Sequence, residues 1–167
     1  WKVTWCMVRQ RGLSPDLKSF IFKLLHRILP TAMRLNRILP NSSSKCSRCN
    51  VEKDESLEHA LVECSANGGV GRGLMALVAH FTNKVVTEVN LVTFNFSGSN
   101  DITNFCLTWF IGTSLSFLWS KRCEKKKVTK IQVLAELEAN YSIMNQIDIA
   151  NAKVLLGVYI NYLSNIN

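Results

Sequence analysis

Hydrophobic residues recur at every third or fourth position over residues 14–30, and this spacing predicts an amphipathic helix. Ser14 can cap the helix, Pro15 suits its first turn, and Pro30 is expected to end it. The helix would bury one apolar face, which consists of Leu17, Phe20, Ile21, Leu24, Leu25 and Ile28.

A shorter helix is predicted to follow directly, with Thr31 as its cap. Its apolar residues Leu35 and Ile38 would face inward. Arg34 and Arg37 are three positions apart, so both would project from the outward side. The segment PNSSS then ends the helix and predicts a loop.

The rest of the chain also shows mostly helical spacing. We expect a short helix over 55–63, a flexible glycine-rich break over 65–73, and further helices over 73–82, 84–93, 102–126, 128–147 and 149–163. Residues 85–96 could instead form a strand. The apolar run within 102–126 is too short and too often interrupted by Ser, Thr and Gly to cross a membrane, so we expect a buried core helix there.

Four side chains that bind soft metals lie close together in the sequence, in the pattern C-x2-C-x9-H-x4-C. They are Cys46, Cys49, His59 and Cys64. Two cysteines separated by two residues place two thiolates on one turn, and four nitrogen and sulfur ligands are typical of a closed structural zinc site. Two other interpretations remain open at this point: buried cysteines without a metal, and a redox-active pair. Glu58 could hydrogen-bond to the neighbouring imidazole.

The remaining cysteines, Cys6, Cys106 and Cys123, are scattered, and the chain shows no signal peptide at its start. This pattern predicts free thiols in a reducing compartment, and hence a protein of the nucleus or cytoplasm. The chain begins with Trp1 and not with Met, so we expect it to be a piece of something longer.

The predicted fold class is mostly α. A helical hairpin with a small zinc knuckle would occupy residues 1–64, and a helical bundle would occupy residues 74–167. The chain has 167 residues, of which 47% are hydrophobic, so it can build a real core. The tryptophans are expected to be core anchors and not platforms for stacked bases: Trp1, Trp5, Trp109 and Trp119.

The net charge of +8 is concentrated in the first part of the chain. Residues 1–50 contain ten Lys and Arg residues and a single acid, Asp16, whereas residues 51–167 are close to neutral. This asymmetry favours a polyanionic partner, although a solvated basic face would show the same composition.

Several segments together resemble a known family. They are KSFIFKLLHRILPT, AMRLNRI, CSRC and ESLEHALVEC, followed later by GTSLSFLWSKRCEKK with its W-x-x-R motif. In this order they resemble the zinc-binding region at the C-terminal end of non-LTR (LINE-type) retrotransposon reverse transcriptases. The resemblance covers residues 10–127 and is densest over 18–64. It departs from the family at 65–73, where the glycine-rich segment replaces an expected aromatic residue.

The resemblance implies that Cys46, Cys49, His59 and Cys64 ligate structural Zn²⁺, and that the chain binds element RNA or target DNA beside the rest of a parent polymerase, in an intracellular ribonucleoprotein. RNA is favoured over DNA on the resemblance alone. No segment resembles the F/Y-x-D-D motif of a polymerase active site, so we expect no enzymatic activity from this chain.

Two hypotheses for function follow. In the first, the chain is a non-catalytic nucleic-acid-binding accessory domain, and its phosphate contacts come from Arg34, Arg37, Lys45 and Arg48, with help from Lys18, Lys23 and Arg27. The lysines of 125–127 would contribute less, the more so if residues 121–130 fray. In the second, the chain is a zinc-stabilised protein–protein interaction module, adopted by a host from such an element, whose C-terminal helices pair with a partner or with a second copy as a homodimer.

Overall fold

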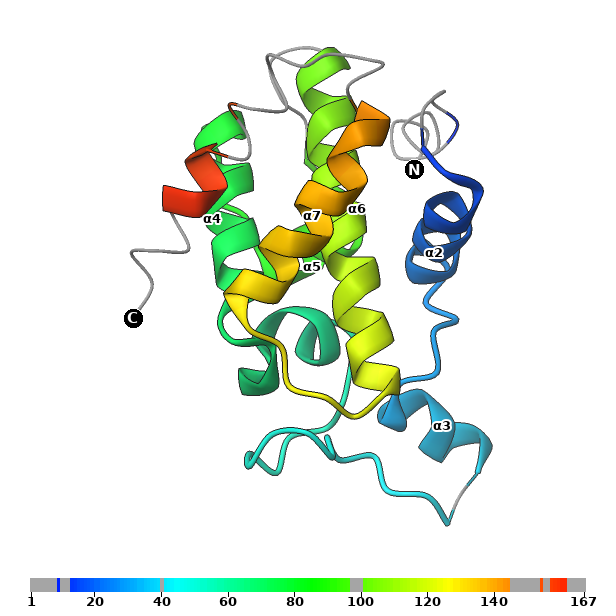
Figure 1. Ribbon diagram of the computed structural model, residues 1–167. Helices are drawn as coiled ribbons and strands as arrows, with labels where there is room; N and C mark the ends of the chain where they lie inside the picture. Colours follow the sequence, from blue (N-terminus) through cyan, green and yellow to red (C-terminus); the bar gives the residue numbers. More distant parts are fainter. Residues whose placement is uncertain are drawn as a thin grey trace.

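The computed structural model of the chain describes Arg9, residues 13–39, 41–96 and 101–144, Val154, and residues 157–161 (Figure 1). Its helices are α2 (Pro15–Leu25), α3 (Ala32–Ile38), the π-helical η1 (His59–Glu63), the 3-10 helix η2 (Ser65–Asn67), α4 (Val70–Thr82), α5 (Glu88–Val92), α6 (Asp101–Cys123) and α7 (Lys130–Met144). The described residues contain no sheet, only one isolated antiparallel bridge between Lys45 and Asp54. The prediction of a mostly α fold is confirmed.

Helix α6 lies at the centre of the core, as its apolar sequence predicted. Its residues from Phe105 to Leu115 are all buried, and it packs against α2, α4, α7 and η1. One buried cluster joins apolar residues of α2 to those of α4, α5, α6 and α7, so the N-terminal helix and the later helices share a single core. None of the described helices combines the length and the hydrophobicity that crossing a membrane requires.

Helix α2 starts as predicted and ends early. The backbone N–H of Leu17 donates to Ser14 Oγ at 3.2 Å, which confirms the cap. The helix ends at Leu25 and not at Pro30, because the chain turns at Arg27, whose φ of 54° is left-handed. The five apolar residues before this turn are buried as predicted, whereas Ile28 beyond it is 42% exposed.

Helix α3 is capped by Thr31, whose hydroxyl accepts a hydrogen bond from the Arg34 backbone N–H at 3.3 Å. None of its residues is buried. Leu35 is half-buried, but Ile38 is 63% exposed, so the prediction that Ile38 faces inward is wrong. In Figure 1, α3 projects at one edge of the molecule, next to the loop that carries the first two cysteines.

The glycine-rich segment 65–73 is not the flexible break that the sequence predicted. Helix η2 and the first turn of α4 run through it, and Asn67 within it is completely buried. Gly68 and Gly69 have left-handed φ values of 59° and 76°, which reverse the chain between the two helices. A Cβ on Gly71 would lie 2.3 Å from the Val62 carbonyl oxygen, so only glycine lets α4 approach η1 this closely.

The other predicted elements differ mainly in their ends. The segment predicted as a helix over 84–93 contains only the five residues of α5, and no strand forms within 85–96. Helix α6 ends three residues before its predicted limit. Helix α7 is helical to Met144, and the rest of its predicted range lies outside the described residues. Most of the helix predicted over 149–163 lies outside the described residues, although 157–161 are helical. Trp109 is buried and Trp119 is half-buried, whereas Trp1 and Trp5 lie outside the described residues.

Candidate metal centre

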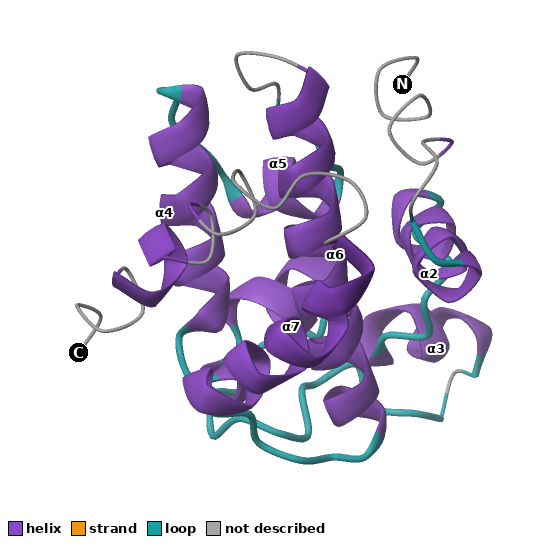
Figure 2. Cartoon of the chain, turned by 45° about the horizontal axis from the view of Figure 1, so that its top comes forward, coloured by secondary structure: helices purple, strands orange, loops and turns teal. Residues whose placement is uncertain are grey.

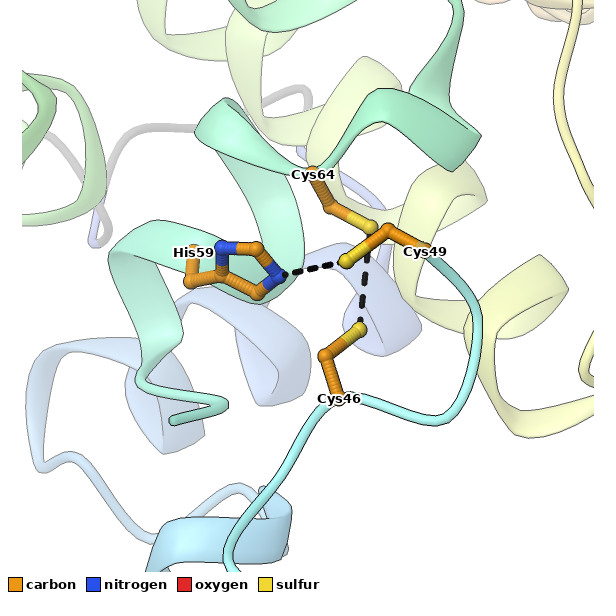
Figure 3. A group of neighbouring side chains, drawn as sticks. All are labelled: Cys46, Cys49, His59 and Cys64. Atoms are coloured by element: carbon orange, nitrogen blue, oxygen red, sulfur yellow. Dashed lines mark hydrogen bonds between the residues drawn. The ribbon is translucent and has the colours of Figure 1, made fainter. Parts of the chain in front are cut away.

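The structure brings the four predicted metal ligands together. Cys46 and Cys49 come from the loop between α3 and η1, His59 opens η1, and Cys64 directly follows it (Figure 3). One sulfur or nitrogen atom from each residue lies within 4.8 Å of all the others. Figure 3 shows the four side chains pointing toward a common centre.

The distances between ligand atoms fit a tetrahedral zinc ion. Cys46 Sγ and Cys64 Sγ are 3.8 Å apart, and Cys49 Sγ lies 3.4 Å from His59 Nε2. Zinc bonds of about 2.3 Å to sulfur and about 2.05 Å to nitrogen require separations of about 3.8 Å and about 3.5 Å in a regular tetrahedron. Both of these distances agree with this geometry, and all four ligand atoms lie within 4.8 Å of one another, so the four residues can hold zinc once the wider separations contract.

The unusual geometry of η1 explains how His59 and Cys64 reach the same centre. Residues five apart point in different directions on an α-helix, whereas a π-helical turn stacks them because its hydrogen bonds join residues i and i+5. Here the Cys64 N–H donates to the His59 carbonyl at 2.9 Å. The backbone then leaves the helix at Cys64, with ψ at 124°. The π turn therefore places both ligands on one side of the helix.

The loop of the first two cysteines is closed by its own backbone. The Cys46 N–H donates to the Lys53 carbonyl at 3.0 Å, and the Glu55 N–H donates to the Ser44 carbonyl at 2.9 Å. These bonds fold residues 44–55 back on themselves and place both thiols over η1. We call residues 41–54 the zinc loop.

Burial controls the protonation of the thiols and the imidazole. Burial raises the pKa of the Cys64 thiol to about 12. Burial of Cys49 acts in the same direction, but hydrogen bonds with the Val51 backbone and the two nearby thiols outweigh it, so the pKa of Cys49 is lowered. Burial lowers the pKa of His59 and favours the neutral imidazole, which is the form that binds a metal. Zinc must therefore displace the Cys64 proton but finds His59 ready to coordinate.

The carboxylate beside the imidazole is that of Glu63 and not that of Glu58. Glu63 Oε2 lies 3.5 Å from His59 Nδ1 and also accepts a hydrogen bond from Lys53 Nζ at 2.6 Å. Glu58 points elsewhere and pairs with Arg27 at 2.5 Å, so the expectation that Glu58 contacts the imidazole is wrong. A carboxylate close to the second nitrogen of a metal-bound imidazole fixes the ring orientation and increases the basicity of the ligand.

A comparison with known families agrees with this geometry. Residues 1–70 match the family model described as zinc-binding in reverse transcriptase. This part of the chain is therefore similar to the zinc-binding region of reverse transcriptases. All four ligands fall inside the matched segment, which confirms the resemblance seen in the sequence and favours zinc over the two metal-free interpretations. No curated protein and no solved structure matches the chain.

Of the basic residues proposed to contact phosphate, Arg48 does not fit that role. It is only 7% exposed, and its guanidinium is used inside the protein. It donates to the Asn67 side-chain oxygen at 2.8 Å, the Ala60 carbonyl at 3.1 Å and the Lys126 carbonyl at 3.2 Å. Arg48 therefore links the loop of the first two cysteines to η1, to η2 and to the connection after α6. We remove it from the candidate phosphate contacts.

The other basic residues that were proposed to contact phosphate differ in their exposure and in their ion-pair partners. Lys23 and Arg37 are exposed, and Lys18 is half-buried. No carboxylate of the described residues forms an ion pair with these three side chains. Arg27 pairs with Glu58, and Lys45 pairs with Asp54 at 3.0 Å. Arg34 is half-buried and donates to the Arg27 carbonyl at 2.9 Å, which fixes the turn between α2 and α3.

An ion pair that the sequence analysis missed joins the zinc loop to the rest of the fold. The Glu55 carboxylate, in a residue only 1% exposed, accepts hydrogen bonds from Arg122 at the end of α6 and from the Ala32 N–H at the start of α3. Arg122 also lies over the Trp119 ring, 4.8 Å from its centre. Both members of the pair belong to motifs quoted above, the E of ESLEH and the R of W-x-x-R. The sequence signal existed, but only the fold shows that these residues meet.

Proposed function

We propose that this chain is a non-catalytic nucleic-acid-binding accessory domain of a retroelement reverse transcriptase, stabilised by structural zinc bound to Cys46, Cys49, His59 and Cys64. All four positions of the tetrahedron are filled by protein ligands, so no coordination position is left for a substrate or an activated water. The zinc holds the zinc loop against η1, and its role is structural. RNA is the favoured ligand, because the sequence resembles a region of an RNA-copying enzyme, and target DNA is the second choice.

The supporting observation is the excess of basic side chains over α2, α3 and the zinc loop. Residues 13–54 contain eight basic residues and three acids. Arg48 is buried, but Arg37 on α3 and Lys23 on α2 are exposed, and no described acid pairs with either. Basic side chains on an ordered surface lose less entropy on meeting phosphate than the same charges on a disordered tail.

The salt dependence of binding tests this proposal. We would titrate a fluorescent single-stranded RNA of mixed sequence, and separately a duplex DNA, with the zinc-loaded chain at several salt concentrations. The Arg34→Ala, Arg37→Ala double variant should weaken binding to all sequences similarly and reduce the salt slope, by about 0.7 per lost contact on the single-stranded RNA and about 0.9 on the duplex DNA.

Lys84→Glu is the control, because it changes the net charge by the same two units at a position that follows the C-terminal end of α4. In Figure 1 this end of α4 points away from the zinc loop. The control variant should leave the salt slope nearly unchanged. Binding that does not depend on salt, or no binding to either nucleic acid, would refute the proposal.

The second candidate function is a zinc-stabilised protein–protein interaction module, adopted from such an element. The exposed apolar residues of the α3 end favour it, because Ile38 is 63% exposed and Leu39 is 57% exposed. Under this alternative the Ile38→Ser, Leu39→Ser variant would lose a protein partner and keep its behaviour toward nucleic acid.

A further inference from the structure

The connection between α6 and α7, residues 124–129, carries three consecutive lysines, and we call it the lysine loop. It lies outside the segment that matches the zinc-binding family. From the sequence, fraying of this segment was an open possibility, but the structure fixes it from two sides. The Lys126 carbonyl accepts from Arg48 Nη1 at 3.2 Å, and the Val128 N–H donates to the Ala66 carbonyl at 2.8 Å.

Buried contacts reinforce these two hydrogen bonds. The Val128 side chain is 3% exposed and belongs to the main core cluster. The Val128 carbonyl lies so close to the chain reversal after η2 that a Cβ on Gly68 would come within 2.6 Å of it. The backbone of the lysine loop is therefore held on the reverse transcriptase zinc-binding region, and the buried Arg48 is the direct link between the two.

The lysine loop also lies beside the zinc loop in space. Figure 1 shows the connection after α6 running directly above the loop that carries Cys46 and Cys49, and Figure 2 shows the two loops together along the same edge of the molecule. The hydrogen bond from Arg48 to the Lys126 carbonyl crosses from one loop to the other. Lysines on this connection are therefore neighbours of the zinc loop, although they are about eighty residues away in the sequence.

The three lysines differ in their partners. Lys126 Nζ pairs with Glu124 at 2.8 Å, and Glu124 pairs with Lys121 as well, at 3.0 Å. Lys125 and Lys127 are exposed, and among the described residues no carboxylate forms an ion pair with either. The left-handed φ of Lys125, 56°, shows that the loop turns sharply at this residue. The lysine loop therefore presents two unneutralised ammonium groups on a fixed backbone.

We propose that Lys125 and Lys127 form a second phosphate-contacting surface beside the zinc loop, which adds to the exposed Lys23 of α2 and Arg37 of α3 and binds the same nucleic-acid strand. This inference rests on the proposed nucleic-acid function and adds a surface that lies outside the matched family region. Nucleic acid fits better than an acidic protein, because the loop exposes no apolar side chain and its one large hydrophobic residue, Val128, is buried. The centre of a protein interface needs apolar or aromatic anchors, whereas phosphate contacts need only positioned charge.

The test compares the Lys125→Ala, Lys127→Ala double variant with wild type, each loaded with zinc, on a single-stranded RNA of mixed sequence. Each phosphate contact to a single strand contributes about 0.7 to the salt slope, so loss of both should lower the slope by about 1.4. The same loss corresponds to a roughly 25-fold weaker affinity near 0.1 M salt. Both lysines are exposed, so zinc content and melting temperature should stay at wild-type values. A Lys125→Gln, Lys127→Gln variant gives a second measurement if the alanine variant is altered.

Lys84→Glu serves as the matched control for the loss of two charges, and the Arg34→Ala, Arg37→Ala variant reports on the proposed function itself. If the arginine variant lowers the salt slope and the lysine variant behaves like Lys84→Glu, the lysine surface is refuted and the proposed function stands. If wild type shows no salt-dependent binding to RNA or DNA, both fail. If wild type binds polyglutamate through these lysines and not RNA, the lysine loop is a surface for acidic proteins, and this inference is wrong.

Discussion

The substitution Glu55→Gln should destabilise the fold far more than an ordinary change in a loop. Glu55 is 1% exposed, and its carboxylate accepts hydrogen bonds from the Ala32 N–H at 3.0 Å and from Arg122 Nε at 3.1 Å and Nη2. Through these bonds one side chain joins the zinc loop to the start of α3 and the end of α6. Glutamine keeps the shape and one acceptor oxygen, but it leaves the Arg122 charge without a partner.

The expected loss follows from the burial of both members. Removing one partner of a buried ion pair costs about 3–5 kcal/mol, because the other charge stays desolvated. The Arg122 side chain is 16% exposed, so water recovers part of the loss and we expect a value near the lower limit, about 3 kcal/mol. For a chain of this size that corresponds to a fall in melting temperature of roughly 6–12 °C.

Thermal unfolding of the zinc-loaded chain, followed by circular dichroism, measures this loss. Glu124→Gln is the matched control, because Glu124 also pairs with basic side chains near the end of α6 but is exposed, so its replacement should leave the melting temperature almost unchanged. Adding Arg122→Met to Glu55→Gln should recover part of the stability, since the unpaired charge is then gone.

The same variant should also release zinc faster to a coloured chelator, because Glu55 directly follows the zinc loop. The reasoning is refuted if Glu55→Gln has the melting temperature of wild type within error. It is also refuted if the Glu55→Gln, Arg122→Met double variant loses more stability than the two single variants lose when their losses are added.

Three further predictions concern the zinc site and its support. Wild type should contain one zinc per chain by elemental analysis, and Cys49→Ser should lose it and unfold the zinc loop while most of the helical circular dichroism remains; a folded wild-type chain without zinc would contradict this. Because the pKa of Cys64 is raised to about 12, metal-free Cys64 is protonated at neutral pH and zinc displaces its proton. Zinc affinity should therefore rise with pH by at least about tenfold per unit between pH 6 and 8, and a chelator competition that shows no such rise would refute this. Gly71→Ala should lower the melting temperature strongly, because its Cβ would lie 2.3 Å from a backbone oxygen of η1, whereas Gly157→Ala meets no atom within 4 Å and should be neutral or slightly stabilising in the same measurement.

The metal ligands were predictable from the sequence because their chemistry is local. Three cysteines and a histidine within nineteen residues are typical of a metal site, and the spacing alone suggests one centre. The caps of α2 and α3 were predictable for the same reason. The hydroxyls of Ser14 and Thr31 each accept a hydrogen bond from a backbone N–H three residues later in the chain. A contact over so few residues can be predicted from the local sequence.

Tertiary structure decided where the chain is rigid and where charge is available. Arg48 lies between two zinc ligands, and from the sequence a charged residue there is expected at the surface. In the fold, its guanidinium donates hydrogen bonds to Asn67 and to the Lys126 carbonyl, which are distant in the sequence. The segment 65–73 contains four glycines that predict flexibility, yet Gly71 serves the close contact between α4 and η1.

By itself, the sequence determined the helical class, the buried face of α2 and the four ligands, since each depends on residues near one another in the chain. Only the tertiary structure decided that Glu55 meets Arg122 and that the lysine loop is held beside the zinc loop. Both are contacts between residues more than sixty positions apart. Such pairings are set by how whole helices pack, and the periodicity of one segment carries no information about which distant segment will cover it.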